Sequence, residues 1–100
     1  MNSFEKQVDR NLMGKRLEKE GKIREAKALY EANISEDFEG SFPYRRLAII
    51  YRKEKSVVDE IRVLNKAVEV FNSLVKSERK DVQPKLQEFC DALEKAKSKL

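Results

Sequence analysis

Apolar residues in this chain recur three or four positions apart, which is the spacing of one face of an α-helix. Glycine, serine and aspartate interrupt the pattern at Gly21, at Gly40 with Ser41, at Ser56 and at Asp81. Between these breaks the pattern predicts five helices, over residues 3–20, residues 22–35, a segment that begins after Ser41, residues 57–80 and residues 82–100. The expected fold class is therefore all-α.

The fourth and fifth segments carry the most regular apolar stripes, with alternating steps of four and three residues. These stripes consist of Val57, Ile61, Leu64, Val68, Phe71 and Val75 in the fourth segment and of Val82, Leu86, Phe89, Leu93, Ala96 and Leu100 in the fifth. Two such stripes joined by a short connection predict an antiparallel helix hairpin. The first segment has a similar stripe, made of Phe4, Val8, Leu12 with Met13, and Leu17.

Residues that favour helix starts agree with these boundaries. Asn2, followed three positions later by Glu5, has the composition of a capping box. Ser41 is the expected N-cap of the third helix, and Pro43 then falls in its first turn, where a missing N–H costs nothing.

Several positions recur after 34 residues, so that Met13-Gly14 aligns with Leu47-Ala48 and Tyr30 aligns with Leu64. Helix pairs repeated at this period resemble the tetratricopeptide repeat family. That family places an aromatic, a leucine-glycine pair and a tyrosine on the first helix of each unit, a pattern similar to Tyr44, Leu47, Ala48 and Tyr51. The resemblance implies a single domain over residues 1–100, arranged as a right-handed array of about five antiparallel helices. It divides into repeat one (about 7–40), repeat two (about 41–74) and a capping helix (about 82–100).

In this resemblance Gly21 forms the tight turn, Ala26 lets the two helices of the first unit approach closely, and Tyr30 fills the space beside them. The sequence departs from the family pattern at Arg10, where an aromatic is expected, at Lys55, where a turn glycine is expected, at Glu60, where a small alanine is expected, and at Phe38 and Asn72, where a proline is expected. We therefore expect the second unit to pack more loosely than the first or with a shifted register.

The composition excludes several classes of function. The chain has 22 basic and 18 acidic side chains, mixed along its length, with a net charge of +4, no histidine and one cysteine. Without histidine the commonest general base and metal ligand are missing, so we expect no enzymatic activity, no metal and no cofactor. No apolar run approaches the roughly 18 residues of a membrane span, so we expect no membrane association. The single cysteine fits a reducing compartment such as the cytoplasm.

The resemblance implies a protein interaction module, an adaptor or scaffold, that binds a peptide or protein partner on its concave face. Carried over to this sequence, the partner-binding positions are Asn11, Lys15, Arg45, Ile49 and Arg52, with Val8 and Phe42 beside them. The arginines lie seven residues apart, which predicts a cationic ladder and hence an acidic peptide as partner. Glu18 is the one acid at these positions, and ordinary solvated charges are the alternative interpretation.

Three other hypotheses remain open at this point. The basic segment 44–55 interleaves arginine with tyrosine, so the alternative function is a nucleic-acid-binding helical protein, although we expect nucleic acid less than a protein partner. The terminal Ser98-Lys99-Leu100 resembles a peroxisomal address, an alternative to the cytoplasm. Phe71 or Val75, near the end of the long fourth helix, would allow a homodimer.

Overall fold

The computed structural model describes residues 2–100 and contains five α-helices. These are α1 (Ser3–Lys19), α2 (Ile23–Ser35), α3 (Phe42–Lys53), α4 (Val57–Ser73) and α5 (Val82–Lys97). No strand occurs in the described part of the chain, so the expected all-α class with five helices is confirmed.

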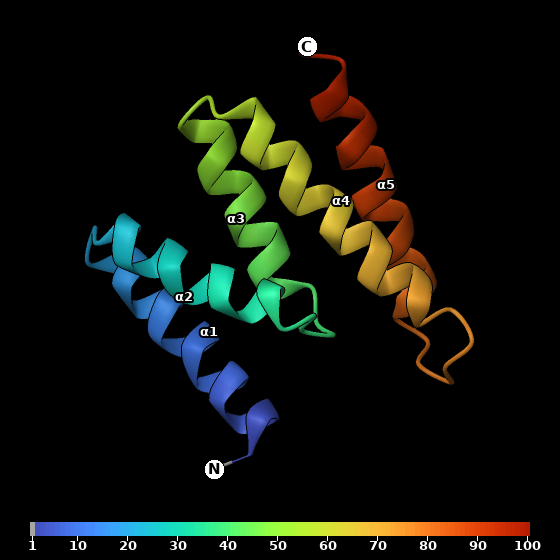
Figure 1. Ribbon diagram of the computed structural model, residues 1–100, viewed down its shortest axis with the longest axis horizontal. Helices are drawn as coiled ribbons and strands as arrows, with labels where there is room; N and C mark the ends of the chain where they lie inside the picture. The colour runs from blue at the N-terminus through green and yellow to red at the C-terminus, as the bar shows by residue number, and fades with distance from the viewer. Residues whose placement is uncertain (1) are drawn as a thin grey trace.

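The helices form a flat array in which each one packs against the next in sequence and runs back in the opposite sense (Figure 1). The array measures 38 × 35 × 18 Å, so it is about two helix diameters thick. Helices α1 and α5 lie at opposite edges, each packed mainly on a single neighbour. Their outer faces therefore receive little cover from the rest of the chain.

Helices α1, α2 and α3 end with the same backbone arrangement. The residues Gly21, Asp37 and Lys55 follow these helices with φ of 77°, 57° and 59°. After each one the chain bonds back to the helix, as in the 2.8 Å bond from the Lys22 N–H to the Leu17 carbonyl. Glycine adopts a positive φ without strain, whereas a lysine side chain opposes it. Gly21 therefore forms the turn that the sequence predicted.

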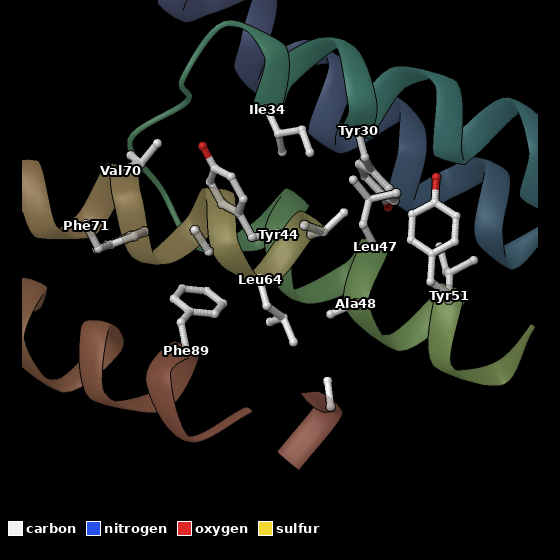
Figure 2. Packing of buried hydrophobic residues seen from close by; sticks show 14 of the residues in the cluster. Tyr30, Ile34, Tyr44, Leu47, Ala48, Tyr51, Leu64, Val70, Phe71 and Phe89 are labelled. Carbon is white, nitrogen blue, oxygen red and sulfur yellow. The ribbon is translucent and has the colours of Figure 1, made fainter. Parts of the chain in front are cut away.

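One apolar core runs through the array, and aromatic rings form much of it (Figure 2). Tyr30, Tyr44, Phe71 and Phe89 are all fully buried or nearly so. The ring of Phe89 in α5 lies 6.2 Å from that of Tyr44 in α3 and 5.6 Å from that of Phe71 in α4. Helix α5 therefore completes the core that α3 and α4 begin.

Small residues let α1 and α2 approach closely around the ring of Tyr30. A Cβ atom added at Gly14 would lie 2.8 Å from Cζ of Tyr30, closer than real Cβ contacts. Ala26 is fully buried on α2, one turn before Tyr30. Close approach at Ala26 and a filling role for Tyr30 agree with the sequence prediction, and Gly14 supplies the matching surface on α1.

Helix α4 is shorter than the sequence predicted, which corrects two expectations. The helix ends at Ser73 rather than near residue 80, because residues 76–80 are all exposed and find no apolar surface on which to continue. Phe71 is fully buried, and Val75 lies beyond the helix end. The overhanging end that was expected to meet a second chain therefore does not exist.

The predicted stripes of α4 and α5 also needed correction. Buried residues of α4 include Val63, Ala67 and Val70, which lie outside the predicted stripe, because α4 packs between α3 and α5 and buries two faces. Leu100, the last residue of the stripe predicted for the fifth helix, is 83% exposed and lies beyond the end of α5.

The apolar stripe predicted for the first helix is mostly not core. Phe4 and Leu12 are 64% and 61% exposed, Met13 is also exposed, and only Gly14 of α1 is buried. The N-cap at Asn2 is confirmed by a 2.8 Å bond from the Glu5 N–H to its side chain. The side chain of Ser41 makes no such bond at α3.

The second helix pair accommodates Glu60 through an ion pair. Its side chain is buried in α4, and both carboxylate oxygens accept hydrogen bonds from Nζ of Lys99, at 3.0 and 3.3 Å. The neighbouring Leu64 and Ala67 are also buried. A cation from the end of the chain therefore compensates for a charge at a position where the repeat pattern expects alanine.

Candidate partner-binding face

An open groove lies between α1 and α3, in the form of two adjoining hollows of about 260 and 250 Å³. Both hollows are lined by Lys15 and Phe42. We call this surface the α1–α3 groove; its lining residues are Val8, Asn11, Leu12, Lys15, Glu18, Lys19, Phe42 and Arg46. The ring of Phe42 packs edge to face on the buried Tyr30, with centroids 5.8 Å apart, so its position is fixed by the core.

The acid in this groove is already neutralised. Arg46 of α3 donates two hydrogen bonds to Glu18 of α1, at 2.6 and 3.0 Å, and the hydroxyl of Tyr30 donates a third at 2.6 Å. Burial raises the pKa of Glu18, but the bonds from Arg46 and Tyr30 outweigh it and hold the pKa below its usual value. Glu18 therefore stays ionised, and its oxygens are already bonded to Arg46 and Tyr30. The ion pair with Arg46 also links α1 to α3.

Two lysines of the groove have no such partner. Lys15 and Lys19 are exposed on α1, and neither forms an ion pair with any residue from 2 to 100. With Glu18 and Arg46 compensating each other, the groove carries a net positive charge. It can therefore attract an anionic group without a competing carboxylate from the protein.

The structure separates the five predicted binding residues into two groups. Lys15 and Arg52 are exposed and Ile49 is half-buried, and within the described residues the two cations make no ion pair. Arg45, by contrast, forms a two-bond ion pair with Glu88 of α5, with both distances 2.9 Å. The predicted ladder of Arg45 and Arg52 therefore has one free member, and of the five residues only Asn11 and Lys15 line the α1–α3 groove.

Asn11 belongs to a polar network that the sequence gave no reason to expect. The fully buried Asn33 of α2 donates bonds to the side chain of Asn11 at 2.8 Å and to the carbonyl of Gln7 at 2.7 Å. Arg10 donates to Asn33 at 3.1 Å and to Glu36 at 2.8 Å. Arg10 thus fills the place of the aromatic expected in the repeat pattern by bonding to an asparagine.

Sequence reasoning missed Leu12, Lys19 and Arg46 as groove residues. The signal for Leu12 was present, because it follows Val8 by one turn, and Val8 was placed beside the binding positions; the apolar stripe nevertheless assigned Leu12 to the core. Lys19 and Arg46 stand among many other cations, and no feature of the sequence distinguishes them.

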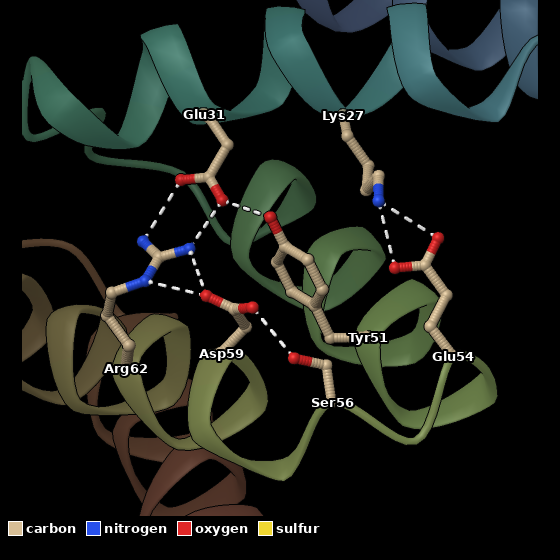
Figure 3. A network of polar contacts seen from close by, with 7 residues as sticks. All are labelled: Lys27, Glu31, Tyr51, Glu54, Ser56, Asp59 and Arg62. Atoms are coloured by element: carbon tan, nitrogen blue, oxygen red, sulfur yellow. Dashed lines mark hydrogen bonds and ion pairs between the residues drawn. The ribbon is translucent and has the colours of Figure 1, made fainter.

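The opposite side of the array, between α2 and α4, is occupied by internal contacts (Figure 3). Glu31 of α2 accepts hydrogen bonds from Arg62 of α4 and from the hydroxyl of Tyr51. Lys27 contacts both carboxylate oxygens of Glu54 at 2.9 Å. These contacts join the two helix pairs and use the charges of that side, so it offers few free groups to a partner.

Another hollow, of about 500 Å³, lies where the start of α1 meets the loop before α3. Its charged groups are also mostly engaged. Glu36 pairs with Arg10, and Asp37 pairs with Lys66. Arg79, the cation that lines this hollow, pairs with Asp81. We therefore do not place a ligand there.

The basic segment 44–55 is largely taken up by the fold. Tyr44 and Tyr51 are buried, so their rings cannot stack on bases. Arg45 and Arg46 are held by carboxylates of α5 and α1. A nucleic acid would therefore meet Arg52 and the lysines near it rather than an interleaved surface.

Within residues 2–100 there is no group of three or more potential ligands that could hold a metal ion. Over the same range, no helix combines the length and apolar character needed to cross a membrane. In comparisons with known proteins, no family model, curated protein or solved structure matches the chain.

Proposed function

We propose that this chain is a protein interaction module of the tetratricopeptide type, with two helix pairs and a capping helix. Burial at positions 34 residues apart supports the repeat. Gly14 and Ala48 are both buried, as are the residues of three further pairs, Ala26 and Glu60, Tyr30 and Leu64, and Asn33 and Ala67. The turn residues Gly21 and Lys55, which share a positive φ, keep the same offset.

The partner we propose is a peptide that presents an apolar side chain next to a carboxylate. One observation carries this proposal: the hollow between Val8, Leu12 and Phe42 is apolar and open, and the free lysine Lys15 stands at its rim. An apolar side chain gains about 25 cal/mol for each Å² that it buries there. A neighbouring carboxylate would bond to Lys15 or Lys19, which face no protein acid.

In this proposal Arg45 and Arg52 no longer have equal roles in binding a partner. Arg45 holds α5 through Glu88, so its replacement should affect the packing of α5 more than the binding of a partner. Arg52 remains free to contact the distal end of a longer peptide. The proposal places the module in a reducing compartment such as the cytoplasm, because its one cysteine has no partner for an internal disulfide.

A selection from a random peptide library tests the proposal directly. Enriched peptides should combine an aromatic or aliphatic residue with aspartate or glutamate within a few positions. Their affinity should fall about five-fold or more in Lys15→Glu, because a favourable contact of about 1 kcal/mol becomes a repulsion. Arg24→Glu on α2 is the matched control, since Arg24 is also exposed but lies outside the groove.

Circular dichroism must show the same helicity in both variants. Equal loss of affinity in the two variants would reveal a non-specific charge effect and contradict the proposed groove. The absence of any enriched peptide would contradict the proposed partner class.

A further inference from the structure

Helix α1 carries more exposed large apolar side chains than any other element of the described chain. Six large apolar side chains are exposed among residues 2–100, and Phe4, Leu12 and Met13 of α1 account for half of them. The other three are spread over α4 and the two segments that follow α4 and α5. Phe4 stacks on the ring of Phe38 in the same chain, with centroids 6.3 Å apart, so Leu12, beside the half-buried Val8, is the apolar centre that α1 leaves open to a partner.

We propose that α1 pairs with α1 of a second copy of this chain in an antiparallel, two-fold symmetric dimer. The contact would be made by the outer stripe of α1, which we define as Glu5, Val8, Leu12, Lys15 and Lys19. These residues step by three and four positions, so they follow one line along the helix. All of them are exposed except Val8, which is half-buried.

The order of side chains in the outer stripe makes it complementary to itself. Glu5 and Lys15 lie equally far from the level of Arg10, on opposite sides, and so do Val8 and Leu12. In an antiparallel pair with its two-fold axis at that level, Glu5 of one copy faces Lys15 of the other, and Val8 faces Leu12. Symmetry then repeats each contact, giving two ion pairs around an apolar centre.

A parallel pair would instead place Glu5 on Glu5 and Lys15 on Lys15. The charges therefore select the antiparallel orientation.

A second copy also explains Glu5 better than an acidic peptide does. A purely acidic ligand would be attracted by Lys15 and Lys19 but repelled by Glu5, whereas a second α1 satisfies both ends of the stripe. The outer stripe borders the α1–α3 groove, because Val8, Leu12 and Lys15 also line one of its hollows. A second α1 would therefore lie along the open side of that groove.

Sedimentation velocity over a wide concentration range, without any peptide, tests the dimer. The wild-type mass should rise to twice that of the chain. Leu12→Glu should keep the chain monomeric, and Glu5→Lys and Lys15→Glu should each raise the dissociation constant at least ten-fold. The double variant Glu5→Lys with Lys15→Glu should restore dimerisation to within a few-fold of wild type, since both ion pairs are then reversed rather than lost.

Lys6→Glu is the matched control, because Lys6 is exposed on the side of α1 away from the outer stripe, and it should leave the dimer unchanged. Circular dichroism excludes unfolding, as all substituted positions are exposed. A wild-type chain that stays monomeric at the highest concentration would overturn the proposal. So would a dimer that survives Leu12→Glu, or a charge exchange that fails to restore association. These results do not depend on the peptide-binding proposal.

Discussion

The ion pair between Glu60 and Lys99 allows a quantitative test of how this fold accommodates a buried charge. The side chain of Glu60 is only 5% exposed, and Lys99 supplies the hydrogen bonds to both of its oxygens. Replacing Lys99 with methionine would leave the carboxylate buried without a cation. Removing one partner of a fully buried pair typically costs about 3–5 kcal/mol.

The expected cost here is smaller, because Lys99 is itself 34% exposed and water can partly take its place. We expect Lys99→Met to lower the free energy of unfolding by about 2 kcal/mol. For a domain of this size such a change lowers the melting temperature by roughly 8–16 °C. Thermal melts followed by circular dichroism, with urea unfolding as a second measure, would detect it easily.

Two further variants separate the ion pair from other effects of the substitution. Lys97→Met changes a neighbouring exposed lysine without an ion pair among the described residues, and it should alter the melting temperature by less than about 2 °C. Adding Glu60→Met to Lys99→Met should recover most of the loss, since replacing both partners by apolar groups is often neutral. The reasoning is refuted if Lys99→Met melts like Lys97→Met, or if the double variant is no more stable than the single one.

Three other predictions follow from the described contacts. Lys55→Gly should raise the free energy of unfolding by about 0.5–1 kcal/mol, measured by urea unfolding, because glycine tolerates the φ of 59° that strains lysine; an unchanged midpoint would contradict this. Gly14→Ala should cost about 1–3 kcal/mol in the same assay, because its Cβ would collide with the ring of Tyr30; wild-type stability would mean that the ring moves freely. Burial raises the pKa of Tyr30, Tyr44 and Tyr51 above the ordinary value near 10. The stability linked to these groups is therefore complete below about pH 10 and falls above it, and absorbance should show almost no phenolate until the chain unfolds.

The course of the helices was predictable because it depends on local information. The three-and-four spacing and the breaks at Gly21 and Ser56 fix where helices begin and end, and neither requires knowledge of neighbours. The predicted end of α4 was wrong because the apolar stripe in the sequence continues to Val75. The sequence shows apolar spacing, but it does not show whether a surface is present to receive it.

Apolar side chains of α1 are exposed for the same reason, namely that no neighbouring surface covers them. Met13 and Leu47 occupy equivalent positions 34 residues apart, yet Met13 is exposed and Leu47 is fully buried. A helix covers Leu47 because α3 has neighbours on two sides, whereas α1 is the first element and has one. Local sequence is similar at the two positions, so only the place of each helix in the array distinguishes core from surface.

The candidate site was less predictable because ion pairs decide which charges are free. Glu88 is 43 residues from Arg45, and Glu18 is 28 residues from Arg46. With 40 charged residues in the chain, no sequence pattern selects these partners from the alternatives. Lys15 was correctly expected at the surface beside Phe42, but its importance depends on Glu18 being neutralised by another residue.

The peptide-binding and dimer proposals use common residues, so they predict competition. Val8, Leu12 and Lys15 line the α1–α3 groove and also belong to the outer stripe of α1. A selected peptide should therefore shift the wild-type chain from dimer to monomer, and its apparent affinity should weaken as protein concentration rises. In Glu5→Lys, which weakens the dimer from outside the groove, this concentration dependence should disappear. An added charge could change the affinity itself, but it would not remove a dependence on concentration. A peptide that binds the intact dimer at full affinity would show that the two surfaces are separate, and would contradict the placement of at least one of them.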